Sequence, residues 1–407
     1  MKRKILAGNH LLAVIFLLVL SLTLLLGRSF ANAEEVRGVS DDNVKLGIIA
    51  DQTGGAATAT VPLTKGARMY FRHINDMGGI NGRKVEIILE DDRYTIPGSF
   101  AAFKKLLFRD RVLSILLCGG TGQTLALMQQ IEKYKVPVLP WSLADKMTIP
   151  LRRYIFTITA SYDDGLKIII DYIMKDMKAG NPRISYVYPD VEFGKTGLET
   201  VEQYLPKYNL RLTSKIVLGI GAIEATSEVL NLDRQKIDYI IFNNGGTAAV
   251  AFLKTAKQYG LKSKVIGAFY AGTEDVLSGG RENAKDLIVI SPFSYWYEDP
   301  PGMIELRKIA KNYELDPKQN NRSFIQGWIT SMICAEGLRR AGRNLTPESL
   351  IQAYETFQNF GTGGLSQPVN YSKTDHKGGK AFKMYKTDVK KEVFIPITDF
   401  REPAFKD

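Results

Sequence analysis

Short apolar runs and amphipathic stretches alternate through the first third of the chain. Unbroken apolar runs of four to seven residues predict buried strands, and stretches with apolar residues three and four apart predict helices. Ser99 is the predicted N-cap of one such helix. Buried strands that alternate with helices indicate a parallel sheet covered on both faces. The predicted strands are 44–50, 85–90, 112–118 and 136–139, and the predicted helices are 62–77, 99–109 and 123–134.

The same alternation begins again after a run at 154–158, which predicts a strand with no helix directly before it. Two α/β units of similar size are therefore expected, and the segments left over at the end suggest that the chain crosses between them more than once. The predicted strands of the second unit are 184–188, 216–218, 239–242 and 265–267, and its helices are 195–204 and 247–259. Helices at 301–313, 324–341 and 347–357 and a hairpin of 381–385 with 393–397 follow.

The first 33 residues have the pattern of an export signal. Lys2, Arg3 and Lys4 form a basic start, residues 11–26 are almost wholly apolar, and Ala31-Asn32-Ala33 has the small-x-small form that signal peptidase recognises. We expect cleavage after Ala33 and release into the periplasm, the alternative being an uncleaved N-terminal anchor. Neither cysteine lies near residue 33, which excludes lipid attachment there.

Composition narrows the function classes. The 407 residues are 45% hydrophobic and 24% charged, which excludes a disordered or disulfide-dense chain. The net charge of +11 includes four basic residues and no acid within 1–33, so the remainder carries only +7 and does not indicate a nucleic-acid partner. Cys118 and Cys334 are predicted to be buried free thiols, because both fall in apolar elements.

The segment from Gly119 to Thr124 is the first candidate site. It follows a predicted strand and begins a helix, so free backbone N–H groups and the positive end of a helix dipole would meet there. Open α/β sheets bind ligands at the carboxyl ends of their strands. A glycine-rich turn with Thr121 as a simple helix cap explains the same residues equally well.

Catalytic and metal-binding patterns are missing from the sequence. Gly194-Lys195 lacks the glycine that a phosphate-binding loop needs five residues earlier, since Pro189 stands there. No G-x-S-x-G motif occurs, and from residue 34 on the histidines are His73 and His376 alone, without ligand-type neighbours at metal spacing. Asp91 and Asp92 are adjacent and would point to opposite faces of a strand. We therefore expect no catalytic residue, no metal and no cofactor.

One stretch is specific to a known family. Ile74-Asn75-Asp76-Met77-Gly78-Gly79-Ile80-Asn81-Gly82-Arg83-Lys84 resembles the I-N-x-x-G-G-I-N-G-R-K signature of extracellular solute-binding proteins of the branched-chain amino acid (leucine-binding protein domain) type. The likeness continues through the Cys118–Thr124 loop, Gly260-Leu261-Lys262 and the late Asp375-His376-Lys377-Gly378-Gly379. It covers nearly the whole chain after residue 33.

This resemblance implies a type I periplasmic-binding-protein fold. Two doubly wound parallel-sheet lobes, joined by three crossovers, would close on a small ligand and hand it to the membrane subunits of an ABC permease. We expect crossovers near 157–161, 290–293 and 377–382. The first lobe would comprise 43–158 plus 293–377, the second 159–292 plus 378–407, and the protein would be a monomer.

The resemblance also implies where the ligand lies. In the family, a hydroxyl and backbone N–H groups after the third strand hold the ligand carboxylate, which corresponds to Thr121 and Gly122. Ser142 and Ala144 occupy positions that serve the α-ammonium, and Phe269 stands where the second lobe usually supplies an acid. The full predicted set is Thr121, Gly122, Gln123, Thr124, Trp141, Ser142, Ala144, Phe193, Gly245, Phe269 and Tyr270.

Two of these positions change the expected ligand. Ala144 has no hydroxyl and Phe269 no charge, so a buried ammonium would lack partners at both. A carboxylate without an α-amino group, aromatic or short aliphatic, is therefore as consistent with the sequence as a branched-chain amino acid. Uptake through an ABC importer is the expected function. A ligand-sensing module for a membrane signalling partner and an exported enzyme are the alternatives.

Overall fold

The computed structural model describes residues 36–316 and 321–405. The predicted export signal at 1–33 lies outside the described residues. Within them, no helix has both the length and the apolar character needed to cross a membrane.

A four-stranded parallel sheet forms the core of the first lobe. Its strand order is β2-β1-β3-β4, and all of its neighbouring strands run in the same direction. Every residue of β3 is buried, as expected for a strand covered on both faces. The strands are β1 (Asn43–Ile49), β2 (Lys84–Glu90), β3 (Ser114–Cys118) and β4 (Val138–Leu139). The helices are α2 (Ala57–Asp76), α3 (Ile96–Lys104) with η1 (Lys105–Arg109), α4 (Thr121–Lys133), η2 (Asp145–Met147), α10 (Pro301–Asn312), α11 (Arg322–Ala341) and α12 (Pro347–Tyr354).

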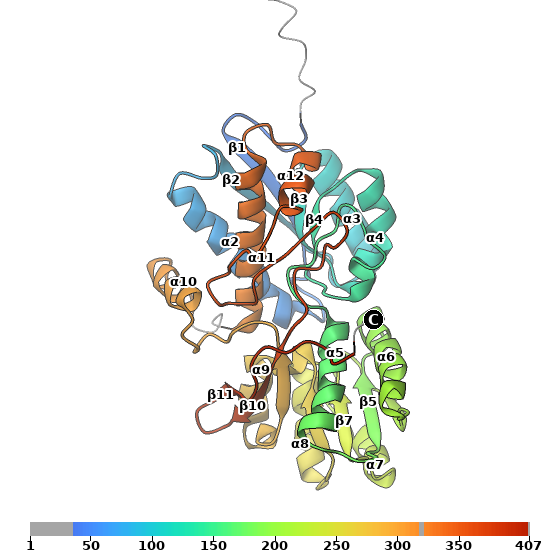
Figure 1. Ribbon diagram of the computed structural model, residues 1–407. Coiled ribbons are helices and arrows are strands. Elements are labelled where there is room, and N and C mark those ends of the chain that lie inside the picture. The colour runs from blue at the N-terminus through green and yellow to red at the C-terminus, as the bar shows by residue number, and fades with distance from the viewer. Residues whose placement is uncertain (1–35, 317–320, 406–407) are drawn as a thin grey trace, which may run out of the picture.

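A seven-stranded sheet of order β11-β10-β9-β8-β7-β5-β6 forms the second lobe (Figure 1). Five strands are parallel, and β10 runs antiparallel to both β9 and β11. The strands are β5 (Ile184–Tyr188), β6 (Ser214–Val217), β7 (Tyr239–Phe242), β8 (Lys264–Gly267), β9 (Ile288–Ser291), β10 (Lys383–Asp388) and β11 (Val393–Pro396). The helices are α5 (Tyr162–Asp171) with η3 (Tyr172–Asp176), α6 (Glu192–Tyr204) with η4 (Leu205–Tyr208), α7 (Thr226–Arg234), α8 (Gly246–Gln258), η5 (Phe269–Gly272), α9 (Glu274–Gly280) and η6 (Arg281–Ala284).

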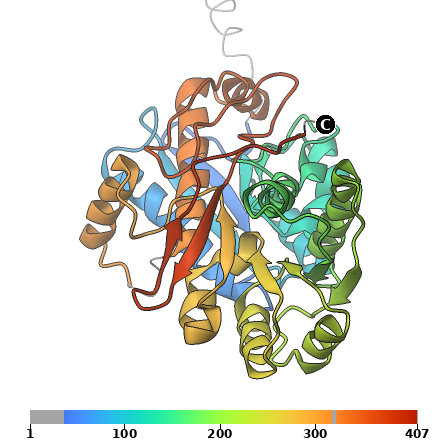
Figure 2. The same cartoon turned by 60° about the horizontal axis from the view of Figure 1, so that its bottom comes forward.

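The chain passes between the two sheets three times. It leaves the first sheet after β4, returns after β9 and leaves again before β10 (Figures 1 and 2). Thr157 of the first passage pairs with Lys377 of the third, and Phe293 of the second pairs with Ser366. The predicted fold class, two doubly wound α/β lobes with three crossovers, is confirmed. The predicted domain boundaries are consistent with these passages and stay a prediction.

A buried ion cluster links the first and third crossovers. The Lys377 ammonium lies 3.0 Å from Asp145 Oδ1 and 2.8 Å from Asp164 Oδ2. Asp163, the residue before Asp164 in α5, accepts the N–H of Asp145 at 2.8 Å. Burial raises the pKa of Asp163 to about 6, and the nearby Asp145 charge adds to the shift. Lys377 therefore compensates part of a dense group of acids at the point where the lobes join.

The two longest helices pack backbone against backbone in the first lobe. A Cβ added at Gly327 of α11 would lie 1.9 Å from the carbonyl oxygen of Leu63 in α2, and one at Gly66 would lie 2.1 Å from that of Phe324. Only glycine permits so close an approach. These two residues set how α11 sits on α2.

Several local predictions were wrong. The helix predicted from residue 62 begins at Ala57, so Pro62 lies inside it. The predicted cap Ser99 lies within α3, where its hydroxyl donates to Asp92 at 2.6 Å, and Thr95 is the cap instead. The predicted strand at 154–158 makes only isolated bridges, because it is the first crossover. Helix α5 was not predicted from the sequence, and all ten of its residues are buried, the charged Asp163 and Asp164 included.

Candidate functional site

A cleft between the lobes is lined by residues that follow the carboxyl ends of strands in both sheets. It contains about 960 Å³ of empty space, with open solvent at its mouth included. The lining of the first lobe is Gly55, Ala56, Thr58, Ala59, Tyr94, Thr121, Trp141, Asn321 and Ser323. The second lobe and the first crossover add Tyr162, Pro189, Phe193, Ile220, Gly221, Asn244, Gly245, Gly246, Thr247, Tyr270, Thr273 and Asp275. This is the position at which open α/β sheets bind ligands.

Six helices of ten residues or more begin at this cleft, namely α2, α4, α5, α6, α8 and α11. Two of these helices have side-chain N-caps, Ser161 at α5 and Asn321 at α11. At α8 the carboxylate of Asp275 lies close by, 3.8 Å from the point where a Cβ on Gly246 would stand. Helices α2 and α4 have neither a side-chain cap nor an acid in the first turn, but Asp51 Oδ2 accepts the N–H of Ala56 at 2.7 Å just before α2. The N–H groups at the start of α4 are therefore available for an anion.

A hydroxyl pair and an indole lie at the start of α4. Thr121 Oγ1 is 2.8 Å from Ser142 Oγ, and both side chains are buried. A Cβ on Gly120 would meet Tyr94 Cε2 at 2.6 Å and Trp141 Cζ2 at 3.3 Å, so the glycine lets both rings approach the helix. Among the described residues the indole N–H of Trp141 has no hydrogen-bond partner, although the side chain is only 5% exposed. A buried donor without a partner is costly and marks a place for an acceptor.

Aromatic rings join the two lobes across the cleft. The Tyr162 and Tyr270 hydroxyls are 2.8 Å apart, and the Phe193 ring lies 5.2 Å from the Tyr162 ring and 5.4 Å from the Tyr270 ring, centre to centre. Trp141 meets Tyr270 edge-on at 6.4 Å. Burial raises the pKa of Tyr94 to about 12, so this hydroxyl stays neutral. The rings give the cleft an apolar wall with neutral polar tips.

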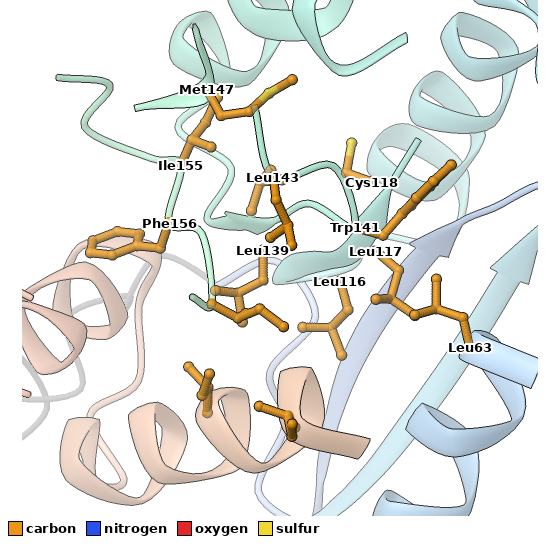
Figure 3. Packing of buried hydrophobic residues seen from close by; sticks show 14 of the residues in the cluster. Leu63, Leu116, Leu117, Cys118, Leu139, Trp141, Leu143, Met147, Ile155 and Phe156 are labelled. Carbon is orange, nitrogen blue, oxygen red and sulfur yellow. The ribbon is translucent and has the colours of Figure 1, made fainter. Parts of the chain in front are cut away.

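The core supports this wall from behind. Figure 3 shows Trp141 beside Leu117 and Cys118, with Leu63 of α2 close by. The backbone carbonyl of Trp141 accepts the Gln326 amide of α11 at 3.0 Å. The indole therefore belongs to the hydrophobic core and to the cleft at once, which fixes its orientation.

Known proteins share the sequence pattern and the fold of this chain. The model of the family described as periplasmic binding protein matches residues 43–392, which is most of the chain. The chain belongs to the periplasmic binding protein family. The Leu/Ile/Val-binding protein of Escherichia coli K12 is 22% identical over 256 residues, which cover 62% of this chain and 69% of that protein.

Two solved structures share the periplasmic binding protein fold over almost the whole chain. A branched-chain amino acid ABC transporter protein from Thermus thermophilus with bound valine has a TM-score of 0.84 and 22% identity, covering 90% of this chain and 98% of its own. A fatty acid ABC transporter substrate-binding protein from Thermomonospora curvata has a TM-score of 0.80 and 22% identity, covering 91% and 95%. The resemblance to type I periplasmic binding proteins of the branched-chain amino acid family is thus confirmed.

The structure brings some of the predicted site residues together and separates others. The predicted residues that line the cleft are Thr121, Trp141, Phe193, Gly245 and Tyr270. Those outside the lining are Gly122, Gln123, Thr124, Ser142, Ala144 and Phe269.

Each residue outside the lining has another environment. Thr124 donates its hydroxyl to the Cys118 carbonyl, Gln123 is buried, and Ser142 lies behind Thr121. Gly122 faces the second lobe, where a Cβ would lie 3.4 Å from Glu192 Cβ. Ala144 is buried ahead of η2. For Phe269 the buried ring faces the Arg322 guanidinium, whose carbon lies 3.9 Å from the ring centre.

Several cleft residues were not predicted from the sequence. Tyr94 and Asn244 both follow strands that the sequence did predict, so the ends of those strands were the signal that could have found them. Tyr162 and Asn321 come from a crossover and from a returning helix, and nothing local in the sequence marks them. Their place in the cleft depends on how the lobes assemble.

Proposed function

We propose that this periplasmic binding protein is the substrate-binding component of an ABC importer and binds a small carboxylate between its lobes. It is exported, loses residues 1–33 after Ala33, and acts as a monomer that docks on the membrane subunits of a permease. The observation that carries the proposal is the uncapped start of α4 beside the unpartnered Trp141 N–H in an aromatic cleft. These groups serve binding and not catalysis.

The start of α4 suits a carboxylate in particular. Thr121 supplies a hydroxyl, the first turn supplies backbone N–H groups, and Trp141 supplies an indole N–H. Each is a donor, and two oxygens of one carboxylate accept several donors at once. Ser142 Oγ lies 2.8 Å from Thr121 Oγ1, and this hydrogen bond orients the Thr121 hydroxyl. The ligand carboxylate therefore binds to the first lobe.

The rest of the ligand lies against the rings. Phe193, Tyr270 and Trp141 offer apolar surface from both lobes, which favours a branched aliphatic or an aromatic group. The relative from Thermomonospora curvata is named for fatty acids, which have a carboxylate and no amino group. That precedent supports an acid without an α-amino group as the ligand class.

Asp275 favours a second candidate, an α-amino acid. Its side chain lines the cleft from the second lobe and is exposed there. It is the acid available to an ammonium among the described lining residues. The relative from Thermus thermophilus contains valine, which is consistent with such a ligand. The two candidates differ in one chemical group and can be tested as pairs.

A thermal-shift screen with matched pairs tests the proposal. Leucine with 4-methylpentanoate and phenylalanine with 3-phenylpropanoate differ only in the amino group. A ligand that binds only the folded protein raises its melting temperature. We expect the acids without the amino group to raise it and the amino acids to do so less. A shift with leucine alone, abolished in Asp275→Asn, would support the second candidate, and no shift with any small acid would contradict the proposal.

Thr121→Ala is expected to weaken binding of the best acid from that screen by about 1–3 kcal/mol, the usual range for a lost hydrogen bond to a charged group. Thr121→Ser keeps the hydroxyl and serves as the matched control, with near-normal affinity expected. Isothermal titration calorimetry measures both. Equal affinity of the alanine variant and the natural protein would mean that the carboxylate does not bind at the start of α4.

A further inference from the structure

A lysine of the first lobe forms ion pairs with the second lobe at one side of the cleft. Helices α4 and α6, which come from different lobes, lie next to each other there (Figure 1). The Lys146 ammonium, in η2, is 2.9 Å from Glu199 Oε2 and 3.4 Å from Glu192 Oε1, and both acids belong to α6. Lys195 of the same helix, by contrast, pairs with Asp190 inside the second lobe.

Glu192 stands beside the helix start that we propose for the ligand carboxylate. A Cβ on Gly122, the second residue of α4, would lie 3.4 Å from Glu192 Cβ. Negative charge is favoured at the N-terminus of a helix, and from this distance a glutamate side chain can turn toward the N–H groups of the first turn. A Glu192 carboxylate in that position would occupy the donors and repel a second carboxylate.

The Glu192 carboxylate is bound elsewhere. Its Oε1 accepts the Thr196 hydroxyl at 3.3 Å and the Lys146 ammonium at 3.4 Å, and among the described residues no backbone N–H of α4 donates to it. Lys146 is outside the cleft lining, so its charge acts on Glu192 and Glu199. The backbone beside Lys146 is anchored, because the N–H of Asp145 donates to the Asp163 carboxylate at 2.8 Å.

We infer that Lys146 is a positioning residue of the binding site, which holds the Glu192 carboxylate away from the start of α4 and leaves the N–H groups there to the ligand carboxylate. The inference rests on the proposed function, because it takes the start of α4 as the carboxylate site. It applies equally to acids with and without an α-amino group.

A double-mutant cycle tests the inference by isothermal titration calorimetry in about 20 mM salt, where exposed charges are weakly screened. The probe is leucine, phenylalanine, 4-methylpentanoate or 3-phenylpropanoate, whichever gives the largest thermal shift. Lys146→Met should raise the Kd about 2- to 30-fold, the range for two exposed ion pairs. Glu192→Gln removes the competing charge and should bind at least as tightly as the natural protein. The double variant should bind as Glu192→Gln does.

Lys195→Met is the matched control. It removes the same charge from the same side of the cleft, but the Lys195 ammonium pairs with Asp190 at 3.0 Å within one lobe, so the Kd should not change. Equal Kd values for Lys146→Met and Lys195→Met would overturn the inference. So would a Glu192→Gln variant that binds as weakly as Lys146→Met, because the ion pair would then act as a clamp between the lobes.

A crystal structure of ligand-free Lys146→Met provides a test that needs no ligand. We expect the Glu192 carboxylate within about 2.7–3.2 Å of a backbone nitrogen in the first turn of α4. A Glu192 carboxylate that stays on the Thr196 hydroxyl would overturn the inference. If none of the four acids binds the natural protein, the proposed function fails, and this structure still decides where Glu192 turns without Lys146.

Discussion

Lys377→Met is expected to lower the free energy of unfolding by about 3–5 kcal/mol at neutral pH, the range for breaking a buried ion pair by removing one partner. The Lys377 ammonium lies 3.0 Å from Asp145 and 2.8 Å from Asp164, and its side chain is 9% exposed. Without it, two carboxylates and the nearby Asp163 face one another at the crossovers with less compensation. Urea denaturation at pH 7.5 measures the loss.

A triple variant serves as the control. Adding Asp145→Asn and Asp164→Asn to Lys377→Met removes the repelling charges, so most of the lost stability should return. The loss in Lys377→Met should also shrink at pH 5, because burial raises the pKa of Asp163 to about 6, so that this carboxyl binds a proton there and no longer adds to the repulsion. A loss that is equal at both pH values and persists in the triple variant would show that the ion cluster does not control stability.

Gly327→Ala is the second large effect, with an expected loss of about 3 kcal/mol in the free energy of unfolding. Alanine has the higher helix propensity by about 1 kcal/mol, which on its own would stabilise α11. The new Cβ, however, would lie 1.9 Å from the Leu63 carbonyl oxygen, and backbone atoms cannot move aside as a flexible side chain can. The two longest helices would have to separate.

Gly180→Ala is the matched control, since a Cβ there has no neighbour within 4 Å. We expect its stability to stay within about 0.5 kcal/mol of the natural protein. Chemical denaturation of both variants gives the comparison. Equal stability of the two variants would mean that α11 and α2 are less closely packed than described.

The alternation of strands and helices made the fold predictable from the sequence. The buried strands carry continuous apolar runs, and the helices beside them keep one polar face. Both kinds of element can therefore be recognised from the pattern of apolar residues in the sequence. Helix α5 shows where this fails, because its first turn contains Asp163 and Asp164, which are buried by the crossovers and not exposed. The apolar run at 154–158 misleads in a similar way. It has the composition of a strand, but it is apolar because the crossover that it forms is buried.

The site was predictable only where one local segment carries it. The start of α4 combines a strand end, two glycines and Thr121 in a single stretch, and Thr121 does line the cleft. By contrast, Phe269 and Tyr270 are neighbours on the short helix η5, and their rings contact each other at 4.9 Å, centre to centre. Tyr270 lines the cleft and Phe269 faces Arg322. Sequence alone cannot choose between two adjacent aromatic residues whose roles depend on a helix from the other lobe.

Tertiary packing, which the local sequence does not reveal, also places Ser142 behind the site. It follows a strand end, as ligand residues do, but its hydroxyl is turned to Thr121 at 2.8 Å. Trp141 was predicted for its apolar surface, and its unpartnered N–H became visible only in the packed structure. That donor is the feature that most narrows the chemistry of the ligand.

A crystal structure of the protein with the best acid from the thermal-shift screen tests most directly whether the ligand carboxylate binds at the start of α4. We expect a carboxylate at about 2.7–3.2 Å from Thr121 Oγ1 and from the Trp141 indole nitrogen, with the apolar part of the ligand against Phe193 and Tyr270. A carboxylate bound at the start of α8, or a Trp141 N–H that still has no acceptor in the complex, would contradict it.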